Sequence, residues 1–168
     1  MALLPQDELA RPYTACFTGH RQLSEHELPA LVMRVEQVLD KLYRLGYRRF
    51  ICGGALGFDM LAAAVVCRLR DSELSDISLH LLLPCHGQDA RWSEPERARY
   101  AEMLRLADSY HYVSQEYSRE AMSLRNRALV TAADLCIAYM TNPASGTGGT
   151  VSMARRRGIP IRNLADLL

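Results

Sequence analysis

Short runs of consecutive apolar residues alternate along this chain with longer segments in which apolar residues recur every three or four positions. The first pattern is typical of buried strands, and the second of helices that bury one face. The runs predict strands at 13–17, 49–52, 77–83, 110–113, 135–139 and 159–161. The recurring positions predict helices from 28 up to a stop at Gly46, at 58–70, 94–106 and 120–132, and a short helix ending near 157.

This alternation of strands and helices predicts an α/β protein in which helices cover both faces of a sheet. We expect a Rossmann-like three-layer sandwich with a mostly parallel sheet. Pro160 predicts an edge position for the last strand, because proline has no N–H to donate to a neighbouring strand. The length suits one domain and the sequence has no repeat or linker, so we expect residues 1–168 to form a single domain.

Charge and cysteine content limit the expected partners and compartment. A formal net charge of +1 gives no electrostatic reason to expect a nucleic-acid or membrane partner. Five cysteines without a CxxC pair predict free thiols in a reducing compartment. Since no apolar run reaches membrane-spanning length and no signal peptide is recognisable, we expect a cytoplasmic protein. No zinc-ligand spacing appears, and we expect neither a metal nor a cofactor.

Glycine and polar residues follow three of the predicted strands, at the edge of the sheet where doubly wound folds bind ligands. After the first strand come Thr18, Gly19, His20 and Arg21. Gly19 permits a close turn, Thr18 offers a hydroxyl, and Arg21 offers a guanidinium to a phosphate or carboxylate. An ordinary turn with a surface arginine explains this segment equally well.

The second predicted strand is followed by a glycine-rich turn that opens a helix. This turn contains Gly53, Gly54 and Gly57, and Asp59 follows in the first helical turn. Glycine-rich turns leave backbone N–H groups free for an anion, and the helix dipole favours negative charge at the same place. Asp59 caps the helix in one interpretation and hydrogen-bonds a ribose or base in the other.

A loop is predicted at 142–150, between the fifth strand and the last helix. It contains Gly146, Gly148, Gly149 and Thr150. This composition after a buried strand favours a close-fitting phosphate cradle over a merely flexible loop.

Side chains from two further segments are expected near these loops. Arg125 and Asn126 lie on the helix before the fifth strand and reach the site from the side. Gln88 and Trp92 follow the third strand and suit the mouth of a pocket, where Trp92 offers a ring to a base. Core packing is the alternative for the tryptophan.

Two common classes of nucleotide-binding protein are disfavoured. The sequence has no GxxxxGK[ST] motif, so it is not a P-loop NTPase. Dinucleotide-binding dehydrogenases carry an acidic residue at the end of the strand that follows the glycines. The corresponding strands end here at Cys52 and at Leu83, with no acid in either place.

Together these motifs resemble the YpsA-like family of the SLOG superfamily. The similar segments are 16–21, 53–59, 83–84 with Gln88 and Trp92, 107–108, 125–126 and 148–150. The resemblance implies a Rossmann-like fold and a role in binding or sensing a nucleotide-related ligand.

Relatives within this superfamily supply the alternative functions. LOG-type phosphoribohydrolases cleave the N-glycosidic bond of nucleoside monophosphates, but Met153 stands where their PGGxGTxxE loop has its glutamate. Ala64 likewise stands where many YpsA-like sequences have a glutamate. Asp59 and Asp134 remain as candidate carboxylates for such chemistry. DprA binds single-stranded DNA, which needs a basic groove with aromatic platforms, whereas the basic run 155–157 more simply complements a helix dipole.

We therefore expect a protein that binds or senses a nucleotide or nucleotide-derived phosphate ligand. Phosphoribohydrolase-like hydrolysis is the alternative, single-stranded DNA binding is less favoured, and the catalytic residue of any enzyme stays unassigned. Apolar helix faces are consistent with a homodimer, and equally with helices that only cover the sheet.

Overall fold

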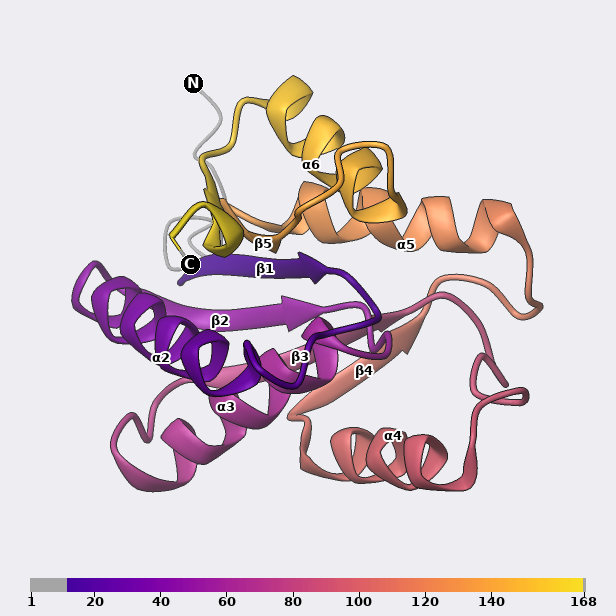
Figure 1. The fold of residues 1–168 in the computed structure, drawn as a ribbon, viewed down its shortest axis with the longest axis horizontal. Helices are drawn as coiled ribbons and strands as arrows, with labels where there is room; N and C mark the ends of the chain where they lie inside the picture. The colour runs from indigo at the N-terminus through magenta and orange to yellow at the C-terminus, as the bar shows by residue number, and fades with distance from the viewer. Residues whose placement is uncertain (1–11, 168) are drawn as a thin grey trace, which may run out of the picture.

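The computed structural model describes residues 12–167, which form a six-stranded sheet in the order β4-β3-β2-β1-β5-β6 (Figure 1). Every pairing between neighbouring strands is parallel. The strands are β1 (Tyr13–Gly19), β2 (Tyr47–Cys52), β3 (Ser78–Leu83), β4 (Ser109–Tyr112), β5 (Leu135–Tyr139) and β6 (Ile161–Asn163). The predicted sheet is confirmed, and β6 lies at its edge as Pro160 indicated.

Helices cover both faces of this sheet (Figure 1). One face carries α2 (Leu28–Arg44), α3 (Phe58–Ser72) and α4 (Glu94–Leu106), and the other carries α5 (Arg119–Ala132) and α6 (Gly146–Arg157). A short 3-10 helix, η1 (Leu164–Leu167), follows β6. Within residues 12–167, none of the helices is both long and apolar enough to cross a membrane. The arrangement is the expected Rossmann-like three-layer sandwich.

Two buried clusters hold the layers together. The larger cluster joins the sheet to α2, α3 and α4, and α2 contributes the face predicted from its periodicity, with Leu31, Val35 and Leu39 fully buried. The smaller cluster joins the sheet to α5 and α6 through residues such as Leu129 and Ala154. Because apolar burial on both faces fixes the strands, the loops at their carboxyl ends are mounted on a rigid base.

The loop predicted at 142–150 is wrong in its second half, because α6 begins at Gly146. The Ser145 side chain caps this helix by accepting a hydrogen bond from the backbone N–H of Gly148 at 3.2 Å. A Cβ atom at Gly148 would lie 1.8 Å from the carbonyl oxygen of Pro143. Glycine at this position therefore serves the close packing of the loop on the helix.

All five cysteines are buried and free, as the sequence predicted. Cys16 and Cys136 are opposite each other on the adjacent strands β1 and β5. The neighbouring Cys136 side chain and burial raise the pKa of Cys16 well above the usual range of a thiol. Burial likewise raises the pKa of Cys52.

Candidate ligand-binding site

A cavity of about 310 Å³ opens at the point where the strand order reverses, between β1 and β5. Four segments line it: the end of β1 with the turn that follows, the start of α3 with the turn before it, the middle of α5, and the first turn of α6 with its cap. The lining residues are Phe17, Thr18, Gly19, His20, Arg21, Ala55, Asp59, Met122, Arg125, Asn126, Leu129, Ser145, Gly146, Thr147 and Thr150. This switch point is where doubly wound sheets hold their ligands.

Most of the residues expected to bind a ligand are brought together here. Those that line the cavity are Thr18, Gly19, His20, Arg21, Asp59, Arg125, Asn126, Gly146 and Thr150. Gly53, Gly54, Gly57, Gly148 and Gly149 are not among its lining residues. A ligand-binding role remains a prediction for both groups.

Backbone groups of the glycine-rich turn before α3 form hydrogen bonds with side chains of this protein. The backbone N–H groups of Gly53 and Ala55 donate to Asp59 Oδ2 at 3.2 and 3.1 Å. The carbonyl oxygen of Gly53 accepts a hydrogen bond from Arg125 Nη1, and that of Gly54 accepts one from Gln88 Nε2 at 3.1 Å. The expectation that this turn offers free N–H groups to an anion is therefore wrong for Gly53 and Ala55.

Asp59 and Arg125 clamp this turn by binding its N–H groups and a carbonyl oxygen respectively, and both also line the cavity. Both are buried, with only 5% and 6% of their surfaces exposed. The N-cap position of α3 is occupied by Gly57, and Asp59 lies inside the helix. The interpretation of Asp59 as an ordinary cap is therefore wrong. Its carboxylate instead holds the turn, while Arg125 Nε donates to Asn126 Oδ1 at 2.7 Å.

Burial dominates the titration of both clamp residues. It raises the pKa of Asp59, although Arg125, the N–H groups of Ala55 and Gly53, and Arg21 all favour the charged form. Burial also lowers the pKa of Arg125, and repulsion from Arg21 acts in the same direction. Two guanidinium groups thus share the cavity with one carboxylate, which leaves it attractive to an anion.

The raised pKa of Asp59 predicts a pH-dependent loss of stability. In the window above the usual aspartate pKa of about 3.9, the native state holds a proton that the unfolded state has released. The free energy of unfolding should therefore fall as pH rises through the folded-state pKa. Asp59→Asn removes this titration, so its stability relative to wild type should increase as pH rises above about 4. Urea unfolding at several pH values measures the difference, and parallel pH profiles would contradict the prediction.

His20 fixes the loop after β5. Its Nε2 accepts a hydrogen bond from the backbone N–H of Thr141 at 2.8 Å, and Asn142 N lies 3.4 Å away. Its ring also packs edge-on against Tyr139, with centroids 6.0 Å apart. Nε2 is therefore occupied by the protein, and His20 holds this part of the cavity wall in place.

The N-terminus of α6 forms another wall of the cavity. Gly148 N and Gly149 N are paired with Ser145. Within residues 12–167, the backbone N–H groups of Gly146 and Thr147 have no hydrogen-bond partner. Free N–H groups and the positive end of the helix dipole make such a terminus a binding site for anions.

Ser145 and Thr147 lie in the expected phosphate loop but were not among the residues predicted to bind the ligand, and Met122 was not predicted at all. The N-cap role of Ser145 had a detectable signal, since a serine directly before a helix is a typical N-cap. Met122 lies on α5 one turn before Arg125, and only the observed packing of α5 on the sheet identifies it.

Asp134, the second carboxylate considered for hydrolysis, lies at the wrong edge of the sheet. It immediately precedes β5, and its Oδ2 accepts a hydrogen bond from the backbone N–H of Thr14 at 2.8 Å. Thr14 lies near the start of β1, so both residues are at the amino ends of their strands. The cavity opens at the carboxyl ends, and Asp59 is the one carboxylate among its lining residues.

The profile of the YpsA family, described as the YspA SLOG family, matches residues 15–155 of this chain. The chain belongs to the YspA SLOG family. It is 31% identical over 119 residues to a UPF0398 protein of Shouchella clausii, a match that covers 71% of this chain and 63% of that protein. The chain therefore spans less than two thirds of this relative's length.

Solved structures support the same fold at low sequence identity. DNA processing protein A from Helicobacter pylori, for which a single-stranded DNA binding mode is described, matches with a TM-score of 0.62 and 17% identity over 94% of this chain and 67% of that chain. The Streptococcus pneumoniae protein DprA matches with a TM-score of 0.64 and 15% identity over 94% of this chain and 51% of that chain.

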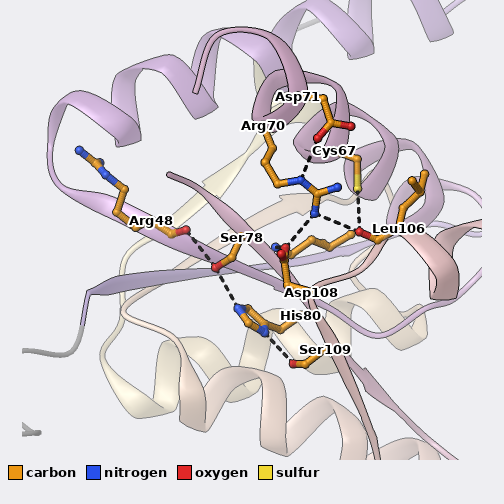
Figure 2. Close-up of polar contacts among 10 residues, drawn as sticks. Arg48, Cys67, Arg70, Asp71, Ser78, His80, Leu106, Asp108 and Ser109 are labelled. Carbon is orange, nitrogen blue, oxygen red and sulfur yellow. Dashed lines mark hydrogen bonds and ion pairs between the residues drawn. The ribbon is translucent and has the colours of Figure 1, made fainter. Parts of the chain in front are cut away.

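Two positions from the resemblance to SLOG proteins lie away from the cavity. Asp108 precedes β4, where its Oδ2 accepts hydrogen bonds from Leu79 N and Arg70 Nη1, both at 2.8 Å (Figure 2). Figure 2 also shows His80 between two serine hydroxyls in the same region, at the amino ends of β3 and β4. Met153, at the position of the LOG-type glutamate, packs on the smaller buried cluster. Asp108 therefore has a structural role in this YspA SLOG protein.

Proposed function

We propose that this YspA SLOG protein binds or senses a nucleotide or nucleotide-derived phosphate ligand, with the phosphate at the N-terminus of α6. The decisive observation is the cavity of about 310 Å³ that joins two arginines to the N–H groups of Gly146 and Thr147, which are unpaired within residues 12–167. Helix N-termini and guanidinium groups both bind phosphate well.

The two arginines have different tasks in this proposal. Arg125 is buried and held by Gly53 and Asn126, so it supplies a fixed positive charge without further ordering. Arg21 is exposed and makes no ion pair within residues 12–167. Its guanidinium is therefore free to close on a bound phosphate, and a bidentate contact would add orientation as well as charge.

A matched pair of substitutions in α6 tests the phosphate position. Gly146 lines the cavity and Gly149 does not, yet a Cβ atom at either position would meet no atom within 4 Å. Both Gly146→Asp and Gly149→Asp add one negative charge to the first turns of α6, where the helix dipole tolerates it. Gly146→Asp should abolish binding by repelling the phosphate, whereas Gly149→Asp should retain it.

Thermal-shift measurements with nucleotides, ADP-ribose, NAD and cyclic dinucleotides provide the readout. A ligand at about 100 times its Kd adds about 2.7 kcal/mol of stability, which raises Tm by several degrees for a chain of this size. A shift that Gly146→Asp removes and Gly149→Asp preserves supports the proposal. Equal loss in both variants, or no shift in wild-type protein free of co-purified nucleotide, would contradict it.

Hydrolysis of a nucleotide or ribosyl derivative is the second candidate, and it depends on Asp59. Cleavage of a glycosidic bond needs a carboxylate to assist an oxocarbenium-like transition state. Asp59 faces the cavity, but Oδ2 already accepts two backbone hydrogen bonds. Incubation with each ligand that binds, followed by chromatography of the products, separates the two functions. Release of free base that Asp59→Asn stops would establish a hydrolase, and intact ligand supports a sensor.

A further inference from the structure

A second hollow, of about 380 Å³, adjoins the cavity and shares Arg21 and Met122 with it. Its other walls come from the connection after β3 and the connection before α5, which contribute Trp92 and Tyr117 respectively. A ligand seated at the N-terminus of α6 can therefore extend past Arg21 into a space bounded by two aromatic side chains.

The aromatic side chains differ in how firmly the protein holds them. The Trp92 ring packs edge-on against Tyr100, with centroids 5.3 Å apart and planes at 73°. Gln88, which also lines the hollow, is buried and tied to the carbonyl oxygen of Gly54. Tyr117 is 70% exposed, and within residues 12–167 its ring has no aromatic partner. One wall is thus fixed, and the other is free to close on an occupant.

We propose that this second hollow is a base subsite, in which a nucleobase packs against Trp92 and Tyr117 while its phosphate lies in the first cavity. The inference rests on the proposed function and narrows it, because the ligand must then be a nucleotide with an intact base. A sugar phosphate fills the first cavity alone. Aromatic side chains stack on any base, since every base has a π-face, so this subsite favours bases as a class.

The experiment compares ligands that differ only in the base. Dissociation constants are measured by calorimetry for the four nucleoside 5′-monophosphates and for ribose 5-phosphate. Tyr117→Ala should weaken nucleotide binding about tenfold and leave ribose 5-phosphate binding unchanged. Tyr110→Ala, on the edge strand β4 and 46% exposed, is the matched control and should change neither. Both side chains are too exposed for their removal to unfold the protein.

Trp92 gives an independent signal because it is the single tryptophan of the sequence. A base stacked on its ring should quench the fluorescence, so a nucleoside monophosphate should lower the emission and ribose 5-phosphate should not.

Different failures separate this inference from the proposed function. If nucleotides and ribose 5-phosphate bind equally well and Tyr117→Ala affects neither, the base subsite is wrong and the phosphate site stands. If Tyr117→Ala weakens both ligands equally, Tyr117 acts on the sugar phosphate and the base subsite is again wrong. If wild-type protein binds none of these ligands while remaining folded, the base subsite is wrong. If it also gives no thermal shift with ADP-ribose, NAD or cyclic dinucleotides, the proposed function fails as well.

Discussion

Replacing Gly57 with alanine is expected to destabilise the protein by about 3 kcal/mol or more. Gly57 has φ 77° and ψ −117°, a conformation that residues with a side chain rarely adopt. An alanine Cβ would also lie 2.3 Å from the carbonyl oxygen of Arg21 and 2.5 Å from that of His20. Both atoms belong to the backbone of the turn after β1, so neither can rotate away. Urea unfolding of wild type and variant measures the loss.

A second glycine separates the two causes of this loss. Gly87 also has a positive φ, 69°, but a Cβ there would meet no atom within 4 Å. Gly87→Ala should therefore cost only the backbone strain, of about 1–2 kcal/mol. If the two alanine variants lose the same stability, the contact between Gly57 and the turn after β1 contributes nothing.

Replacing Arg125 with methionine is expected to cost about 2–4 kcal/mol of unfolding free energy. Methionine keeps most of the side-chain volume but removes the donor to Gly53 O and the charge that most favours the ionised form of Asp59. A buried acceptor without a donor and a buried carboxylate without compensation are each costly. Chemical denaturation again provides the measurement.

Combining Arg125→Met with Asp59→Asn tests whether the loss of stability comes from the unpaired charge of Asp59. In the Asp59→Asn background no carboxylate remains to be left uncompensated, so Arg125→Met should cost clearly less than in wild type. Interacting residues show such coupling in a double-mutant cycle, whereas independent residues give additive losses. Additive losses would mean that Arg125 stabilises the protein only through its hydrogen bonds and packing.

The sequence was sufficient for the order of elements because the apolar pattern of this chain has the right period in almost every element. Consecutive apolar residues in 135–139 match a strand buried on both faces, and the positions spaced along 28–42 match a helix with one buried face. The prediction of a loop was wrong at 146–150, where the low helix propensity of the glycines favoured a loop although a typical capping serine precedes them. The close packing of Gly148 against Pro143 requires glycine in this helix, and helix propensities do not include such contacts.

The sequence predicted where the site lies but not which contacts its charged residues make. The rule that ligands bind at the carboxyl ends of strands selected the turn at 18–21 and the start of α6 correctly as cavity walls. The same rule should have removed Asp134, because a residue directly before a strand lies at the opposite edge. The sequence could not show that the side chains of Asp59 and Arg125 hydrogen-bond to the backbone of the turn at 53–55. Such contacts depend on the distances between elements that are far apart in the sequence.

The burial of all five thiols makes this protein a ready background for site-directed probes. No native cysteine is exposed to a maleimide or a spin-label reagent while the chain is folded, so none needs to be replaced before labelling. A single cysteine introduced at position 117 would carry the only reactive sulfur, at the rim of the second hollow. A dye attached there would report the arrival of any occupant directly, before its chemical identity is known.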